Sequence, residues 1–310
     1  MKIAQVESLL VDRYLFVRIT TDTGITGIGE SGAWGFLDAS RGAIETFAEY
    51  LVGQDPLRIE HHFQMMYRWS HFRGAAIMGA ISAIDIALWD IAGKHFGVPS
   101  YQLLGGKVRD RARVYCHAYG QTREQLVGAC RDAKAAGFTA IGHLTPFLDE
   151  PTTVPLFETH AQKMGAAIDA VRQYREAVGN DVHRRLTPHE AVVLARGIEQ
   201  YHPMFMEDPI LPDNMDAMAY VAANSPVPIA TGERLHTIFE FEMLLSKNAV
   251  QYVRPDVCLC GGITHAKKIA ALAEARHVSV VPHNPLSPVS TAACIQIAAC
   301  CPNFVLQEYP

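Results

Sequence analysis

Concentrated positive charge is absent from this sequence, and this limits the partners that it can bind. The formal net charge is −5, from 27 lysine and arginine residues and 32 acidic residues, and no run of basic residues occurs. Nucleic acids and anionic membrane surfaces are bound through clustered lysine and arginine side chains. We therefore expect no nucleic-acid partner and no membrane partner.

Long apolar runs are absent as well. No stretch approaches the roughly 18 uninterrupted apolar residues that cross a bilayer, and the first residues contain no extended apolar segment typical of a signal peptide. The seven cysteines are an odd number and lie mostly in apolar surroundings, which favours reduced core thiols over disulfides. These features predict a soluble, cytoplasmic protein.

The 310 residues, 49% of them apolar, are enough for about two domains with a large core. Near the N-terminus, three segments rich in β-branched residues predict an antiparallel meander: residues 3–11, 14–20 and 26–30. A helical pattern then continues to about residue 95. We predict an α+β domain over residues 1–111. In its glycine-rich loop 31–36, Trp34 either covers a ligand or packs against its own domain.

Five apolar segments in the second half of the sequence each end in a chargeable side chain. They recur about 25 residues apart, which leaves room for one short strand, one helix and two loops. The residues at their ends are Glu207, Glu233, Asp256, His283 and Glu308. In a parallel α/β barrel the C-terminal ends of the strands meet at one active site. We therefore predict a barrel over residues 112–310 and the convergence of these five side chains.

A series of motifs occurs in order along the sequence: Ser82-Ala83-Ile84-Asp85-Ile86-Ala87-Leu88-Trp89-Asp90-Ile91-Ala92-Gly93-Lys94, His183-Arg184-Arg185-Leu186-Thr187-Pro188, Glu207-Asp208-Pro209, Gly232-Glu233-Arg234, Arg254-Pro255-Asp256, His283-Asn284-Pro285 and Gln307-Glu308. Together they resemble the enolase superfamily, specifically the acid-sugar dehydratases of its mandelate-racemase-like group. The resemblance covers essentially the whole sequence. It implies an α/β protein with an enolase-like α+β capping domain followed by a (β/α)7β TIM-type barrel.

The resemblance also implies a metal site. Removing a proton from the carbon beside a carboxylate creates an enediolate, and a divalent cation on the carboxylate oxygens stabilises its charge. Ligands that are all hard oxygens select Mg²⁺ over zinc. The implied ligands are Glu207 and Glu233, with Asp181 in the position of the third ligand, two residues before His183.

The implied catalytic residues surround the same site. Asp256 fixes the tautomer of His283 and raises its basicity, which makes His283 the general base. His183 acts as the general acid on the leaving hydroxyl, and Glu308, in its protonated form, donates to the substrate carboxylate. Further substrate contacts are expected from Trp34, Asn284 and His143, although His143 could equally be a barrel-interior histidine bonded to its neighbours.

One departure from the superfamily bears on the reaction. Racemases and cycloisomerases of this superfamily carry a lysine on the second barrel strand as a second base, whereas Gly142 and His143 stand there. We therefore predict a Mg²⁺-dependent hydro-lyase that converts a sugar acid, its small-molecule partner, to a 2-keto-3-deoxy acid. The alternatives are a racemase or epimerase of a hydroxy acid and a catalytically idle barrel. We expect a homo-oligomer.

The third barrel strand is not evident in the sequence. Gly179 to Val182 leads directly into His183 with no apolar run between them. Crossing a barrel takes a strand of about five or six residues. We therefore predict that the third strand is missing, that residues are absent between Val182 and His183, and that one metal ligand is lost with them. We also expect this chain to continue past Pro310, because the relatives that it resembles run on and return to the capping domain.

Overall fold

The computed structural model describes residues 1–310 except 70, 143, 148–158, 178–181 and 184–185. The chain forms two compact units, which we call the first and second unit. The first unit comprises Met1–Ala112, Glu233–Glu242 and Pro255–Gln307. The second unit comprises Arg113–Gly232, Met243–Arg254 and Glu308–Pro310.

The first unit begins with a three-stranded antiparallel sheet in the order β1-β2-β3. Its strands are β1 (Ile3–Val11), β2 (Tyr14–Thr21) and β3 (Thr26–Ser31). Alternate residues of β2 are buried, with Leu15, Val17 and Ile19 on the core face. This period of two is what a sheet with one covered face requires, and the predicted meander is confirmed.

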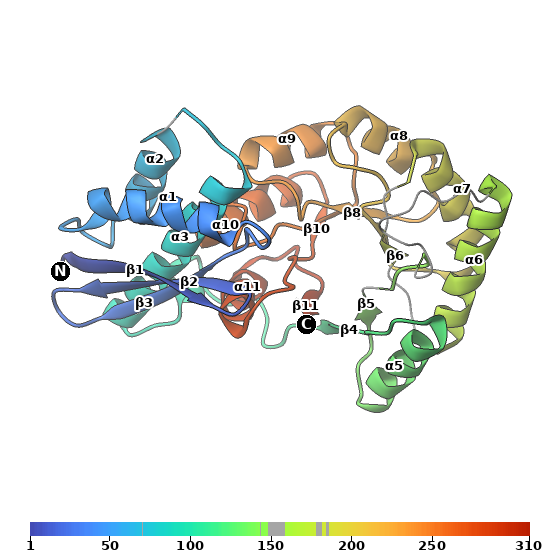
Figure 1. Ribbon diagram of the computed structural model, residues 1–310, viewed down its shortest axis with the longest axis horizontal. Helices are drawn as coiled ribbons and strands as arrows, with labels where there is room; N and C mark the ends of the chain where they lie inside the picture. The colour runs from blue at the N-terminus through green and yellow to red at the C-terminus, as the bar shows by residue number, and fades with distance from the viewer. Residues whose placement is uncertain (70, 143, 148–158, 178–181, 184–185) are drawn as a thin grey trace. The chain divides into compact units, whose positions relative to one another are not determined.

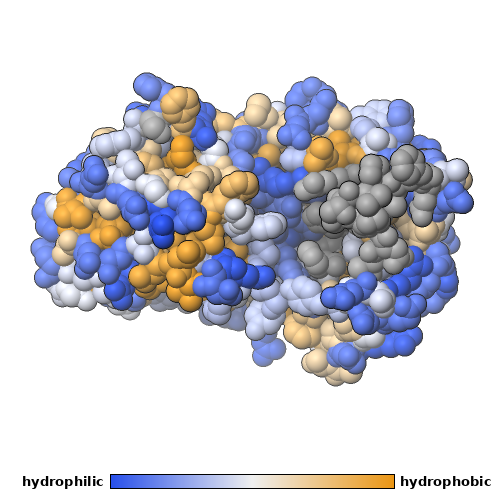
Figure 2. Space-filling model, in the orientation of Figure 1, coloured by the Kyte–Doolittle hydropathy of each residue, from blue (hydrophilic) through white to orange (hydrophobic). Residues whose placement is uncertain are grey.

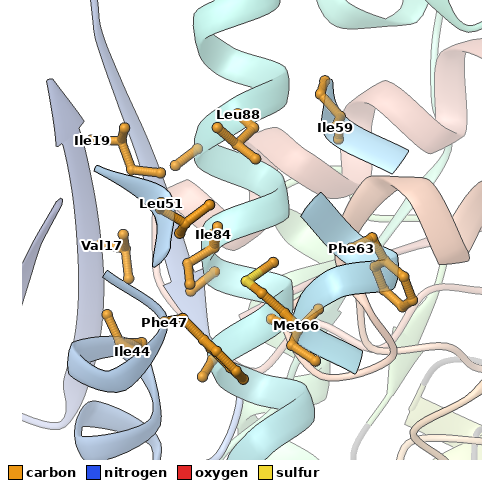
Figure 3. Close-up of a cluster of buried hydrophobic side chains, with 14 of the residues drawn as sticks. Val17, Ile19, Ile44, Phe47, Leu51, Ile59, Phe63, Met66, Ile84 and Leu88 are labelled. Carbon is orange, nitrogen blue, oxygen red and sulfur yellow. The ribbon is translucent and has the colours of Figure 1, made fainter. Parts of the chain in front are cut away.

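Four helices follow the sheet in the first unit: α1 (Leu37–Leu51), α2 (Ile59–Trp69), α3 (Ala75–Phe96) and α4 (Ser100–Leu103). Helix α3 is long and apolar enough to cross a membrane by length and composition, but 72% of its apolar window is buried inside the protein. Figure 3 shows why, because Ile84 and Leu88 of α3 lie among side chains of β2, α1 and α2. Burying each such side chain contributes roughly 1.5–3 kcal/mol.

Two glycines of β3 allow α3 to approach the sheet closely. A Cβ atom on Gly29 would lie 1.9 Å from the carbonyl oxygen of Ala83, and one on Gly27 would lie 2.0 Å from that of Ala87. No side chain fits in that space, so the sheet and the helix are in backbone contact here (Figure 1).

The later segments of the first unit include α10 (Gly262–Glu274), β10 (Ser279–Val280), α11 (Pro288–Cys300) and the start of α9 (Ile238–Ser246). Side chains of α3 cap the N-terminus of α10: Gly261 N–H donates to Ser82 Oγ over 2.8 Å, and Thr264 N–H donates to Asp85 Oδ1 over 3.0 Å. Trp89 Nε1 adds a 2.9 Å hydrogen bond to Thr264 Oγ1. These three α3 residues lie on one face of the helix, and together they fix the loop that leads from Asp256 into α10.

The second unit alternates short strands with helices, as a parallel α/β fold requires. Strands β6 to β9 are parallel neighbours in chain order, and β4 pairs in parallel with β5. The elements are β4 (Val114–His117), α5 (Arg123–Ala135), β5 (Ile141–Gly142), α6 (His160–Ala177), β6 (Val182–His183), α7 (Pro188–Ile198), the 3-10 helix η1 (Glu199–Tyr201), β7 (Met206–Glu207), α8 (Met215–Asn224), β8 (Ile229–Thr231), β9 (Tyr252–Val253) and β11 (Gln307–Tyr309).

The predicted absence of a third barrel strand is corrected by β6. Its residues Val182 and His183 pair in parallel with Met206 and Glu207 of β7. Strands β6 to β9 are each only two or three residues long, so a short segment suffices where the prediction assumed about five or six residues. The absence of residues beside β6 stays a prediction.

Candidate active site

Asp256 and His283 form a hydrogen-bonded pair in the first unit. His283 Nδ1 lies 2.9 Å from Asp256 Oδ2, and the two residues also form a parallel backbone bridge. Both are buried. The other carboxylate oxygen of Asp256 accepts a 2.8 Å hydrogen bond from Cys258 N–H. Because the carboxylate is fixed by its own loop, it holds the proton of His283 on Nδ1 and leaves Nε2 as the basic atom.

Glu233 faces that basic atom. Its Oε2 lies 3.3 Å from His283 Nε2, and both side chains belong to the first unit. The structure therefore brings together three of the residues that the sequence predicted for the site. If Glu233 binds a cation, a substrate held by that cation lies next to His283 Nε2. This arrangement is suited to the removal of a proton from the substrate.

The loop containing Trp34 is attached beside the Asp256 loop. Gly32 N–H donates to the carbonyl oxygen of Cys258 over 2.7 Å, and a Cβ atom on Gly32 would lie 3.2 Å from Asp256 Oδ1. Two residues farther on, Trp34 is 63% exposed. This contradicts the alternative that Trp34 packs against its own domain, and the exposed indole is available to a ligand.

Asn284 follows the general-base candidate directly. It is fully buried, and its side-chain amide donates to Thr291 Oγ1 of α11 over 2.8 Å. Nearby, Glu30 of β3 holds the start of α11, since its carboxylate accepts from Ser287 Oγ over 2.6 Å and from Ser290 N–H over 3.1 Å. Burial raises the pKa of Glu30. These contacts fix the segment that follows His283.

Glu207 and Glu308 meet at one buried arginine in the second unit. Arg254 Nε forms an ion pair with Glu207 Oε1, and Arg254 Nη2 lies 2.5 Å from Glu308 Oε2. The third arm of the guanidinium, Nη1, donates to Tyr115 Oη over 2.9 Å. Arg254 has no exposed surface. Its contacts with the two glutamates are not evident from the sequence, although it stands in the motif Arg254-Pro255-Asp256.

His117 at the end of β4 is a second residue of this cluster that the sequence alone did not indicate. Its Nε2 lies 2.6 Å from Glu308 Oε1, and its Nδ1 lies 2.8 Å from Tyr119 Oη. The signal that could have indicated it is the one used for the later strands, a chargeable side chain where a strand ends. Tyr119 is exposed, so this chain of contacts runs from the surface to Glu308.

The surroundings of Glu308 differ from the prediction of a protonated proton donor. One of its oxygens is paired with Arg254 and the other with His117. A guanidinium pairs with an ionised carboxylate, and a protonated Glu308 would give up the charge of this contact. The geometry favours Glu308 as an ionised acceptor.

Some predicted residues are placed only in part. Asp181 and His143 lie outside the described residues, and for His183 the structure describes the backbone, which pairs with Glu207 in the β6–β7 ladder. Among the residues that the structure describes, no group of three or more metal-binding side chains occurs. Glu207 and Glu233 belong to different units, so the convergence of all five strand-end residues stays a prediction.

Comparison with known proteins gives matches along almost the whole chain. Residues 2–105 match the family model of the mandelate racemase / muconate lactonizing enzyme N-terminal domain, and residues 125–310 match the enolase C-terminal domain-like family model. The chain is 39% identical to a D-galactonate dehydratase of Verminephrobacter eiseniae, over 99% of this chain and 81% of the relative. It is 40% identical to one of Xanthomonas oryzae pv. oryzae, over 96% and 78%.

Two solved structures show the same fold. An enolase from Agrobacterium radiobacter, solved with Na and L-malate bound, is 34% identical, with a TM-score of 0.92 over 100% of this chain and 81% of that one. A member of the enolase superfamily from Salmonella Typhimurium is 30% identical, with a TM-score of 0.87 over 99% of this chain and 87% of that one. The predicted architecture of a capping domain followed by a barrel is confirmed by these matches.

Proposed function

The chain belongs to the mandelate racemase / muconate lactonizing enzyme family, and on this basis we propose that it is a hydro-lyase. It removes water from a sugar acid and forms a 2-keto-3-deoxy acid. The observation that carries the proposal is the His283–Asp256 pair with Glu233 at the basic nitrogen. The D-galactonate dehydratases that the chain resembles support the substrate class.

In this reaction His283 Nε2 takes the proton from the carbon beside the substrate carboxylate. Asp256 accepts a hydrogen bond from Nδ1–H and so stabilises the imidazolium that forms. Because Asp256 is itself held by Cys258 N–H, the imidazole does not have to reorient during proton transfer. The preorganised pair lowers the cost of reaching the transition state.

The proposed metal site consists of Glu207, Glu233 and Asp181. The two glutamates offer only carboxylate oxygens, the donor type that Mg²⁺ prefers, and no thiol or imidazole belongs to the set. The donor chemistry therefore fits a divalent cation, and Mg²⁺ is our specific proposal. When bound, the cation would supply charge stabilisation for the enediolate form of the substrate carboxylate.

Departure of the hydroxyl group needs an acid, and His183 is our candidate because its strand pairs with that of Glu207. We assign Glu308 to substrate hydroxyls as an ionised acceptor. The remaining proposed substrate contacts are Trp34, Asn284 and His143. No lysine stands at Gly142 or beside it, which disfavours the two-base racemase alternative.

The decisive experiment is a screen of aldonic and aldaric acids, beginning with D-galactonate, for Mg²⁺-dependent formation of a 2-keto product. The His283→Ala variant should form no product and should not exchange the α-proton with deuterium, while its Mg²⁺ affinity stays nearly unchanged. His95→Ala is the matched control, because His95 is an exposed histidine of the first unit and its loss should not affect turnover.

The other outcomes of the screen identify the alternatives. Deuterium exchange at the α-carbon without loss of water would replace the dehydratase by a racemase or epimerase. Absence of turnover on the whole panel, together with absence of Mg²⁺ binding, would indicate an idle barrel. Product formation that persists in His283→Ala would remove His283 as the base.

We also propose a division into a capping domain, residues 1–111, and a barrel domain, residues 112–310, in a cytoplasmic homo-oligomer. The separate family matches at 2–105 and 125–310 support the division.

Support for the oligomer comes from Figure 2, where apolar side chains gather on the face of the first unit over β2 and α11. Leu10, Val11 and Ile295 are exposed apolar residues of β1 and α11, and such patches mark interfaces between proteins. Analytical ultracentrifugation tests this, and a monomer would contradict it.

A further inference from the structure

We infer that Arg254 couples Glu308 to the metal-binding carboxylate Glu207, so that the charge on Glu308 sets the cation affinity of the site. The inference rests on the proposed function for the role of Glu207 as a ligand. Arg254 is a positioning residue in this account, because it acts through the two glutamates that it contacts.

The guanidinium is held so that it serves both carboxylates at once. Its plane offers fixed directions for donation: Nε faces Glu207, Nη2 faces Glu308 and Nη1 faces Tyr115 Oη. The rings of Tyr115 and Phe205 both lie 5.8 Å from its central carbon. Because the side chain is fully buried, the same guanidinium serves both glutamates without exposure to solvent.

Two buried carboxylates share the charge of one guanidinium here. In a region of low dielectric the attraction between such groups is several times that in water. A change of charge on Glu308 therefore changes how strongly Arg254 interacts with Glu207.

The direction of the coupling follows from competition for Glu207. A divalent cation and the guanidinium both seek the carboxylate of Glu207, and the two positive charges repel each other. Ionised Glu308 draws Arg254 away from Glu207 and so favours the cation. Neutral Glu308 leaves Arg254 to Glu207 alone and so weakens cation binding.

Glu308 is linked to the protein surface through His117 and Tyr119. Glu308 reaches His117 through its second oxygen, and His117 reaches the exposed Tyr119. A hydroxyl-bearing acid that contacts Tyr119 would therefore act on the carboxylate that competes for Arg254. All five groups of this chain, from Tyr119 to Glu207, belong to the second unit.

The test is a double-mutant cycle on Mn²⁺ affinity, measured by electron paramagnetic resonance titration with wild type, Glu308→Gln, Arg254→Met and the double variant. Glu308→Gln should weaken Mn²⁺ binding about tenfold when Arg254 is present and less than threefold when it is replaced. Arg254→Met alone should bind Mn²⁺ more tightly than wild type. Arg113→Met is the control, because Arg113 is an arginine of the same unit that bonds Thr139 instead.

Arg254→Met removes the guanidinium that both buried carboxylates contact, and the variant can fail to fold. In that case Arg254→Lys replaces it, since one ammonium cannot bridge both glutamates and the effect of Glu308→Gln should again fall below threefold. Equal effects of Glu308→Gln in both backgrounds, or no Mn²⁺ binding by wild type, overturn the inference. A wild type that binds Mn²⁺ with this coupling but forms no 2-keto acid overturns the proposed reaction instead.

Discussion

Replacing Asp85 by asparagine should stabilise the protein increasingly as the pH rises. Asp85 lies in α3 and is buried, with Oδ1 accepting from Thr264 N–H and Oδ2 without a hydrogen-bond partner among the described residues. Burial raises the pKa of this carboxyl from its ordinary value of 3.8 to about 7. Asparagine keeps an oxygen for Thr264 but has no charge to bury.

The size of the effect follows from the two pKa values of Asp85. The unfolded chain releases the proton near pH 3.8, whereas the folded protein holds it up to about pH 7. The stability linked to this proton is therefore fully present below pH 3.8 and is lost as the pH rises through 7. At about 1.36 kcal/mol per pKa unit, the total loss is on the order of 4 kcal/mol, and about 2.5 kcal/mol of it falls between pH 5 and 8.5.

Urea unfolding of wild type and Asp85→Asn at pH values from 5 to 8.5 measures this difference. We expect the free energy of unfolding of the variant, relative to wild type, to increase by about 2.5 kcal/mol over that range. Asp90→Asn is the control, because Asp90 lies on the same helix but is partly exposed and paired with Lys94. A difference between Asp85→Asn and wild type that stays constant with pH would refute the reasoning.

Two further predictions concern the first unit. Gly29→Ala should lower the free energy of unfolding in urea by about 3 kcal/mol, because the new Cβ meets the Ala83 carbonyl. Gly42→Ala is the control, since Gly42 faces open space on α1, and it should be neutral or stabilising by up to about 1 kcal/mol. Equal effects of the two substitutions would show that the close contact is unimportant. Trp34→Ala should leave the unfolding free energy unchanged but raise KM about tenfold with little change in kcat, and an unaltered KM would exclude the exposed indole from substrate binding.

The sequence predicted the part of the site that lies at the ends of neighbouring strands. Asp256 and His283 end successive barrel segments, so their proximity follows from parallel topology, and the structure places them 2.9 Å apart. The antiparallel meander followed from a local period of two. These features depend on pattern along the chain, and pattern is what a single sequence contains.

The role of Arg254 could not be derived in the same way. Its contacts join β4, β7 and β11, which are far apart in the sequence, and an arginine in a motif does not reveal which carboxylates it reaches. The ionised surroundings of Glu308 are a property of this tertiary arrangement. The third strand was missed because β6 has only two residues, too few for an apolar period to be visible.

The cap that α3 provides for α10 has a consequence for the order in which the protein folds. Ser82 and Asp85 bond backbone groups that follow them by 179 residues. During synthesis the N-terminal segment leaves the ribosome first and can fold as a unit, so it is ready when the Asp256 loop emerges. Contacts of such long sequence separation also slow folding, because a large loop must close before they form. The loop that contains Asp256 can therefore fold directly against a preformed α3. In a circular permutant that places α3 last, this loop would have to form before α3 is available.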